Sequence, residues 1–317
     1  MDKKSIPNTR YLLRLLRSSH VYLNETAKKS AKHIIFQEGC KIEPYSWIPS
    51  GNVICSIGAF SYGACQLDVL FNIGRYCSIA GGVQVHALNH PYDRVTTSPI
   101  TYTSKLKWIE DAKEELGNKT EFECIKQYGG GRYENPMINI GHDVWIGRDV
   151  LLKRGINIGT GACIAQRSIV THDVPPYSIW GGVPARLIKM RFDDKVIERL
   201  IRSEWWEYAF PQFAGLNILN PLEFCDGLDD LKSKGLKKFK PEPLTFDEIV
   251  KCNEDYEAFV QRITKARNLA DKHWILRRII KQLIDKKRYK KLKTDPDRFF
   301  SDSRSEVIKF LGKYYCK

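Results

Sequence analysis

The sequence predicts a mainly β protein built around a parallel β-helix, with helical segments before and after it. The first observation is a period of six, set by aliphatic residues at Ile140, Ile146, Leu152, Ile158, Ile164 and Val170. A second set of small or β-branched residues follows at Val144, Val150, Ile156, Ala162, Ser168 and Val174. This period fits neither an amphipathic helix nor a simple strand. A fixed short repeat is typical of a solenoid, whose stacked coils bury one continuous core.

The second observation is a break in this period. An earlier block has Leu67, Ile73, Ile79 and Val85 six positions apart, and residues 51–63 predict a degenerate opening coil. Val85 and Ile140 are 55 positions apart, which is not a multiple of six. We therefore expect an excursion over residues 91–137 that leaves the coil as a surface loop with some helix.

Apolar residues at helical spacing predict helices at both ends of the chain. Residues 8–35 and the segment that starts at Asp193 have this spacing, whereas 211–250 is Pro-rich and irregular. Basic helices are expected over 256–292, with a short helix near 303–315. The predicted organisation is an N-terminal helical segment (1–45), a β-helix domain (46–190), a helical cap with an irregular linker (191–250) and a basic helical tail (251–317).

Composition limits the class of protein. A hydrophobic fraction of 43% is typical of a soluble globular chain. No apolar run is long enough to span a membrane, and Arg14 and Arg17 interrupt the apolar start, which argues against a signal peptide. The nine cysteines have no metal-ligand spacing and no paired framework. We therefore expect a cytoplasmic protein with free thiols and no metal site.

The net charge of +14 is concentrated in the tail, because residues 251–317 hold 19 Lys or Arg and 9 Asp or Glu. A basic tail predicts an anionic polymer or a membrane surface as partner. A solvated helical surface explains the charge equally well. Nucleic acid is a weak candidate, because the tail lacks the regular aromatic interleaving that stacks on bases.

Five short motifs resemble those of a known family. They are NHPYD (Asn89–Asp93), VWIG (Val144–Gly147), VPPY (Val174–Tyr177), PAR (Pro184–Arg186) and the WW segment (Ser203–Tyr208). Over about residues 50–210 the chain is similar to the hexapeptide-repeat acetyltransferases, and most similar to the xenobiotic branch with the streptogramin and type B chloramphenicol acetyltransferases. The resemblance implies a left-handed parallel β-helix, a homotrimer with its active sites between neighbouring subunits, and acetyl-CoA as acyl donor without a metal.

The resemblance also implies roles for individual residues. His90, which stands where the excursion leaves the coil, is the expected general base, and His86 is a competing candidate. His86, Asn89 and Asp93 would form the acceptor loop. The backbone of Gly147 and Arg148 would stabilise the oxyanion. The expected substrate- and cofactor-binding residues are Trp145, Ala165, His172, Pro184, Arg186 and Lys189. His172 departs from the lysine that the family often has there, which puts a cation contact at this point in doubt.

The acceptor is inferred from what the chain adds to this branch. An N-terminal helix, a long excursion and a basic tail favour a large carbohydrate, so the main prediction is O-acetylation of a surface polysaccharide or its precursor. The enzyme alternatives are a xenobiotic (antibiotic) O-acetyltransferase and an N-acetyltransferase of an amino-sugar nucleotide. A β-helical binding scaffold without catalysis is the alternative from another class.

Overall fold

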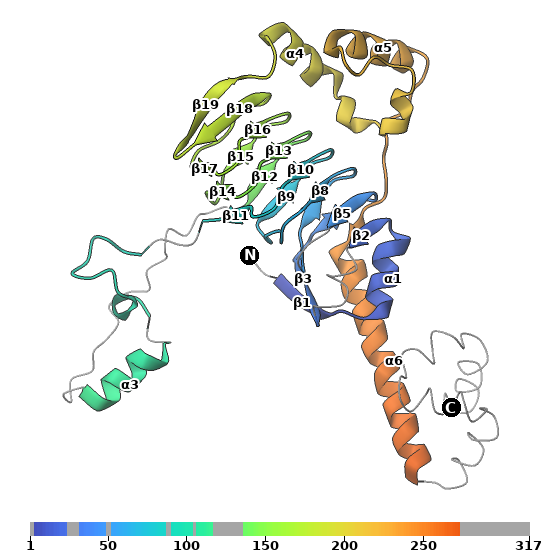
Figure 1. The fold of residues 1–317 in the computed structure, drawn as a ribbon. Helices are drawn as coiled ribbons and strands as arrows, with labels where there is room; N and C mark the ends of the chain where they lie inside the picture. Colours follow the sequence, from blue (N-terminus) through green and yellow to red (C-terminus); the bar gives the residue numbers. More distant parts are fainter. Residues whose placement is uncertain are drawn as a thin grey trace. The chain divides into compact units, whose positions relative to one another are not determined.

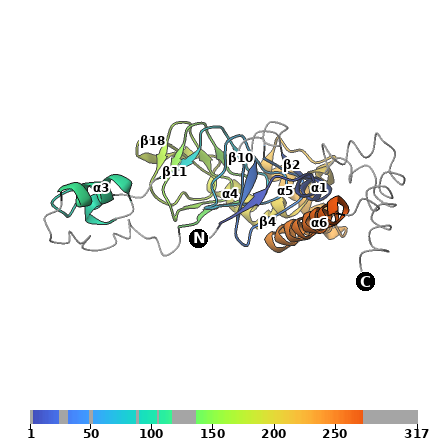
Figure 2. The same cartoon turned by 90° about the horizontal axis from the view of Figure 1, so that it is seen from below.

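A computed structural model describes residues 3–23, 32–48, 52–86, 90–103, 106–116 and 136–272. Its contacts divide the chain into two units. One holds Leu16–Phe246 together with the first six residues, and the other holds Pro7–Leu15 together with the chain from Asp247 onward. The first unit contains the β-helix, whose short stacked strands are seen in Figure 1 and, turned by 90°, in Figure 2.

The β-helix is formed by columns of very short strands, nearly all of them parallel. The six-stranded sheet holds β4 (Lys41–Ile42), β7 (Ser56–Ile57), β9 (Phe71–Ile73), β12 (Ile138–Ile140) and β15 (Asn157–Ile158), with β20 (Leu244–Thr245) antiparallel at its edge. The eight-stranded sheet holds β2 (Val21–Leu23), β5 (Ser46–Ile48), β8 (Tyr62–Gly63), β10 (Ser78–Ile79), β13 (Trp145–Ile146), β16 (Cys163–Ile164) and β18 (Ser178–Gly182), and ends at the antiparallel β19 (Ala185–Met190). The two three-stranded sheets are β1 (Lys3–Pro7), β3 (His33–Gln37) and β6 (Val53–Ile54), and β11 (Gln84–Val85), β14 (Leu151–Leu152) and β17 (Ile169–Val170).

The six-residue period is confirmed as the inward side of this β-helix. All twelve residues of the two predicted sets in the second block, from Ile140 to Val174, are at most 3% exposed. Ile140 pairs with Ile158 in one column, and Ile146 pairs with Ile164 in the next. Each buried aliphatic side chain stabilises the fold by about 1.5–3 kcal/mol relative to an exposed one. The repeat therefore supplies the continuous hydrophobic core of the second block of coils.

An Ile-Gly pair recurs where the coils stack. The N–H of Gly74 donates to the carbonyl of Ile140, and that of Gly141 donates to Ile158, both at 2.8 Å. A Cβ on Gly141 would lie 2.6 Å from the backbone nitrogen of Thr160 in the next coil. A side chain does not fit at this separation, so glycine sets the close approach of one coil to the next.

The N-terminal part differs from its prediction. Among the described residues of the helix expected over 8–35, Arg10–Ser18 form α1, and β2 and β3 follow in place of a continuous helix; residues 24–31 lie outside the described residues. Val21–Leu23 pairs with β5, and Ile35 pairs with Val53. The coils therefore begin before residue 46, because pairing with neighbouring strands outweighs local helical spacing. The domain boundaries drawn from the sequence remain a prediction.

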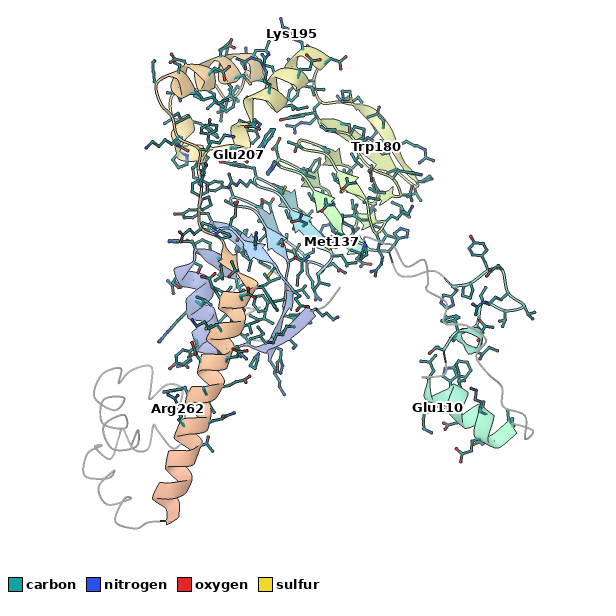
Figure 3. The ribbon with its side chains drawn as sticks, turned by 180° about the vertical axis from the view of Figure 1, so that it is seen from behind. Glu110, Met137, Trp180, Lys195, Glu207 and Arg262 are labelled. Carbon is teal, nitrogen blue, oxygen red and sulfur yellow. The ribbon has the colours of Figure 1, made fainter. Side chains whose placement is uncertain are left out.

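Two helices cap the β-helix after β19. α4 (Asp194–Ser203) starts at the N-cap Asp193, whose carboxylate accepts the N–H of Val196, which agrees with the predicted start at Asp193. α5 (Pro221–Ser233) lies within the segment expected to be irregular, so that expectation was wrong over these residues. Buried side chains of both helices pack in one cluster with Tyr177. Figure 3 labels Lys195 on α4 and Trp180 on the β18–β19 hairpin.

The excursion and the tail are described in part. The excursion contains the 3₁₀ helix Pro99–Thr101 and α3 (Lys107–Leu116), in line with the predicted loop with some helix, and residues 117–135 lie outside the described residues. α6 (Phe246–Lys272) covers the start of the predicted basic tail, and the helices expected beyond residue 272 also lie outside them. Within the described ranges, no helix is long and apolar enough to cross a membrane.

Candidate active site

His90 has two partners at the same ring nitrogen. Its Nδ1 lies 2.8 Å from the carbonyl oxygen of Thr97 and 3.0 Å from the hydroxyl of Tyr102. A carbonyl oxygen can only accept a hydrogen bond, so Nδ1 carries the proton and donates it. Nε2 of the exposed ring then presents a lone pair, as a general base requires. The sequence could not name the orienting partner of His90, and Thr97 takes that place.

A capped turn holds both partners of His90. Ser98 is the N-cap of the 3₁₀ helix Pro99–Thr101, and the N–H of Tyr102 donates to the carbonyl of Pro99 at 3.0 Å. The ring of Pro99 fixes the backbone at the first position of the turn. Thr97 and Tyr102 are therefore placed by one local structure.

Of the other predicted residues of the acceptor loop, the structure describes His86 and Asp93. The backbone N–H of His86 donates to Leu152 at 2.9 Å, and its carbonyl accepts from Nε of Arg154 at 3.0 Å, so His86 is anchored to the β-helix. Its Nε2 is buried without a partner among the described residues. Asp93 is exposed on the loop, and Asn89 lies outside the described residues.

Four exposed aromatic side chains share one outward column of the eight-stranded sheet, with Ser78 between Tyr62 and Trp145. Trp145 points outward from β13 and is 50% exposed, as its position between inward Val144 and Ile146 predicts. In the earlier coils the same outward position holds Tyr22, Trp47 and Tyr62, which pair in register from β2 to β8. The rings of Trp47 and Tyr62 lie 6.0 Å apart. We call Tyr22, Trp47, Tyr62 and Trp145 the aromatic face.

Gly147 has a structural role that the prediction missed. Its N–H donates to the carbonyl of Ile164 at 2.8 Å, so it is not available to an oxyanion. A Cβ at this position would lie 2.6 Å from the nitrogen of Gln166 in the next coil. The assignment of the Gly147 N–H as an oxyanion donor was therefore wrong, and the glycine is explained by coil stacking. The backbone of the exposed Arg148 remains the predicted donor.

Four of the predicted cofactor-binding residues lie on or beside the β18–β19 hairpin, and His172 lies elsewhere. Ala165 packs beside Gly181 on β18, where an added Cβ would lie 3.0 Å from that of Ala165. Pro184 follows a cis peptide bond in the turn to β19, which carries the exposed Arg186 and Lys189. His172 is exposed in a different turn, with Nδ1 2.9 Å from the hydroxyl of Thr171.

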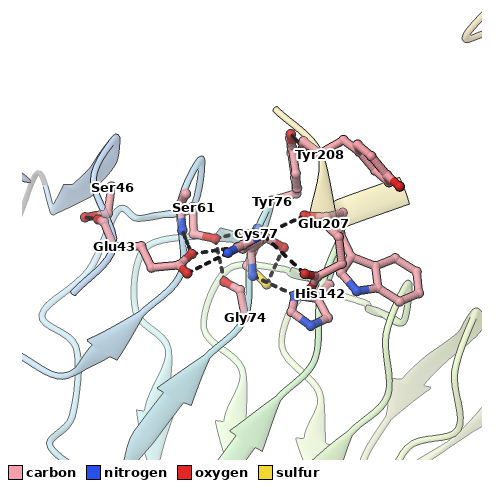
Figure 4. A network of polar contacts seen from close by, with 12 residues as sticks. Glu43, Ser46, Ser61, Gly74, Tyr76, Cys77, His142, Glu207 and Tyr208 are labelled. Carbon is pink, nitrogen blue, oxygen red and sulfur yellow. Dashed lines mark hydrogen bonds and ion pairs between the residues drawn. The ribbon is translucent and has the colours of Figure 1, made fainter. Parts of the chain in front are cut away.

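A polar network that the sequence did not reveal lies at another corner of the β-helix (Figure 4). Arg75 makes two hydrogen bonds of 2.7 Å to the carboxylate of Glu43. Burial opposes ionisation of Glu43, but the hydrogen bonds from Arg75 and from the N–H of Ala59 outweigh it and keep the pKa of Glu43 below its usual value.

His142 joins the same network. Its Nδ1 accepts the backbone N–H of Arg75 at 3.0 Å, and its ring stacks on Trp206 with centroids 5.2 Å apart. Burial, assisted by the positive charge of Arg75, lowers the pKa of His142, although Glu207 and Glu43 oppose the shift. The network thus fastens the segment after α4 to the β-helix. Its carboxylates and cations are paired with one another, so it is a structural cluster.

No protein-family model matches the chain. Among curated proteins, the "Probable macrolide acetyltransferase" of Lysinibacillus sphaericus is 36% identical over 170 residues, which cover 52% of this chain and 84% of that protein. The "Chloramphenicol acetyltransferase" of Klebsiella aerogenes is 36% identical over 157 residues, 46% of this chain and 67% of that protein. The "Galactoside O-acetyltransferase" of Escherichia coli (strain K12) is 45% identical over 60 residues, 19% of this chain and 29% of that protein.

The lengths of these matches bear on the acceptor. The two relatives named for antibiotics align over about half of this chain, whereas the relative named for a galactoside aligns over a fifth. The sequence had favoured a surface polysaccharide on the strength of the added segments. The matches favour the xenobiotic alternative instead.

Proposed function

The chain belongs to the hexapeptide-repeat acetyltransferases, in the branch of the macrolide and chloramphenicol acetyltransferases, and from this premise we propose that it O-acetylates an antibiotic-like acceptor. The chain is an acetyltransferase, and acetyl-CoA is its acyl donor. The proposed acceptor is a largely apolar molecule with a reactive hydroxyl group. The left-handed coil, the homotrimer and a cytoplasmic location are part of the same proposal.

The reaction removes one proton from the acceptor hydroxyl and delivers one proton to the sulfur of CoA. Nε2 of His90 takes the proton of the acceptor hydroxyl as its oxygen attacks the thioester carbonyl of acetyl-CoA. The tetrahedral intermediate carries an oxyanion, which the backbone N–H of Arg148 would stabilise. Its collapse breaks the carbon–sulfur bond, and the imidazolium returns the proton to the CoA thiolate. Acceptor and donor meet directly, so no covalent enzyme intermediate is required.

The observation that carries this proposal is the tautomer of His90. Neutral histidine can act as a base only through the nitrogen that lacks the proton, and the Thr97 carbonyl keeps the proton on Nδ1. A positioned base contributes roughly 10²–10⁴-fold to the rate. His90 would act from a preset orientation, because its partner is a backbone carbonyl in a capped turn.

The aromatic face supports an apolar acceptor. Four large rings point outward from one sheet, and a group of exposed apolar side chains on one face marks a surface that a ligand or a partner covers. Trp145 lies in the register of Cys163 and Ile179 toward the hairpin, where Arg186 and Lys189 would meet the phosphates of CoA. The earlier rings would contact the acceptor or a neighbouring subunit.

A panel of acceptors tests the proposal. CoA release from acetyl-CoA is measured with chloramphenicol, a macrolide, a streptogramin, a surface glycan and an amino-sugar nucleotide. We expect turnover with at least one antibiotic and a loss of at least 10²-fold in His90→Ala. His33→Ala is the matched control, since that histidine is also exposed but lies on β3, outside the predicted site, and it should keep most of the activity. Turnover with the glycan or the sugar nucleotide alone would contradict the proposed acceptor.

A further inference from the structure

Tyr102 makes two contacts with the ring of His90. Its hydroxyl lies 3.0 Å from Nδ1, and the two rings meet edge to face with centroids 5.7 Å apart. Nothing in the motif Asn89–Asp93 points to this tyrosine, which follows His90 by twelve positions. The contact arises because the turn between Thr97 and Tyr102 folds the chain back onto the histidine.

The hydroxyl of Tyr102 has a defined direction in this contact. Nδ1 already carries a proton, because the Thr97 carbonyl at 2.8 Å can only accept. Tyr102 therefore also accepts, and the Nδ1–H is shared between a carbonyl and a phenol oxygen. When His90 takes a proton from the acceptor, the ring becomes positive, and both of these bonds become charge-assisted.

From this geometry we propose that Tyr102 is a positioning residue for His90, a proposal that rests on the role of His90 in the proposed function. Its oxygen holds the Nδ1–H tautomer in the resting enzyme and stabilises the imidazolium formed during transfer. The edge of its ring fixes the rotation of the imidazole. Tyr102 does not touch either substrate in this account and acts only through His90.

The capped turn makes this role specific to Tyr102. The hydroxyl of Thr101 donates to the carbonyl of Ser98 at 3.1 Å, and the N–H of Thr103 donates to Pro99 at 2.9 Å. These bonds hold the backbone on both sides of Tyr102. Tyr92 lies in the same loop but is 86% exposed, so it offers a matched tyrosine without this placement.

The test compares Tyr102→Phe with Tyr92→Phe in the full chain. Removing one charge-assisted hydrogen bond should lower kcat about tenfold and leave KM for acetyl-CoA unchanged. The acid limb of the kcat/KM profile should move to lower pH, since the imidazolium loses an acceptor. Tyr92→Phe should match the wild type in all three respects. A Tyr102→Phe enzyme with wild-type kcat and pH profile would overturn the proposal.

A second measurement separates this proposal from the proposed function. Imidazole nitrogen chemical shifts report the tautomer of His90 by NMR without any turnover. We expect the Nδ1–H form to dominate in the wild type and to lose population in Tyr102→Phe, with no change in Tyr92→Phe. If no acceptor is acetylated but this shift is seen, the proposed function fails and the positioning by Tyr102 stands. Identical tautomer populations in both variants would contradict the positioning of His90 by Tyr102.

Discussion

Two histidines of this chain are held in opposite tautomers by backbone groups. Nδ1 of His90 donates to the carbonyl of Thr97, whereas Nδ1 of His142 accepts the N–H of Arg75. His90 therefore presents a lone pair at Nε2 on an exposed loop, and His142 keeps its proton on Nε2 inside a packed corner. The same side chain serves as a candidate base in one place and as a structural link in the other, because the backbone partner differs.

The lowered pKa of His142 makes the stability of the fold depend on pH. Burial lowers the folded-state pKa of His142 below the usual 6.5, so the unfolded chain binds a proton more readily. Its contribution to stability is complete above about pH 6.5 and is lost as the pH falls toward the folded-state pKa. We expect His142→Asn, whose side-chain oxygen can still accept the Arg75 N–H, to flatten the fall in Tm between about pH 7 and 5.

Exposed His172 supplies the control for this measurement. The variant His172→Asn should retain the wild-type dependence of Tm on pH, since His172 is exposed and the Thr171 hydroxyl is the hydrogen-bond partner of its ring among the described residues. An identical slope in the wild type and in His142→Asn would refute the account of His142. Glu43 does not interfere, because its pKa is held below the usual 4.5 and its own contribution is lost at lower pH.

The Glu43–Arg75 pair should be worth far more than an ion pair on the surface. The Arg75 side chain is 10% exposed, so Glu43→Gln removes the nearer counter-charge of a buried guanidinium and leaves it only Glu207, at 3.8 Å among the described residues. We expect a loss of about 3 kcal/mol in the free energy of unfolding, measured by urea denaturation. Asp230→Asn, which breaks the exposed pair with Lys234, should cost about 0.5 kcal/mol or less. Equal losses of unfolding free energy in the two variants would contradict a larger contribution from the buried pair.

At the scale of the elements, the stacking of coils explains the Ile-Gly pairs. Gly141→Ala would push a methyl group against the backbone of Thr160, and we expect a loss of about 1–3 kcal/mol in unfolding free energy. At Gly81 an added Cβ would meet nothing closer than 3.7 Å, so Gly81→Ala should be neutral or slightly stabilising. Chemical denaturation of both variants checks this contrast. A tolerated alanine at Gly141 would contradict the close approach of the coils.

The elements also show why only part of the β-helix was predictable. Paired residues Ile140 and Ile158 are eighteen positions apart, which is three units of six. Paired residues Ile42, Ile57 and Ile73 are fifteen and sixteen positions apart, because the turns of the earlier coils are shorter. A period of six therefore fails there, although the coils are the same. Trp47 and Tyr62 of the aromatic face were missed for this reason.

The candidate site, like the β-helix, was predictable only in part. The break in the period and the NHPYD motif pointed to His90, and alternation about Ile146 pointed to an outward Trp145. Thr97 and Tyr102 could not be found, because a turn and not a sequence repeat brings them to His90. Gly147 was assigned to the chemistry, although a glycine needed for coil stacking gives the same signal.

At the scale of the whole molecule, the family accounts for about half of the chain. The macrolide relative aligns over 52% of it. Segments beyond the predicted β-helix domain can serve the fold, since β20 pairs with β4. The added length is therefore weak support for a large substrate, and the acceptor has to be identified by chemistry.

The most direct measurement is the detection of the acetylated acceptor by mass spectrometry. Wild type and His90→Gln are each incubated with acetyl-CoA and an antibiotic that releases CoA, after calorimetry has shown that both proteins bind acetyl-CoA equally. We expect an O-acetylated antibiotic from the wild type and at least 10²-fold less of it from the variant. Equal amounts of product from both proteins would contradict the central claim that His90 is the base of an antibiotic acetyltransferase.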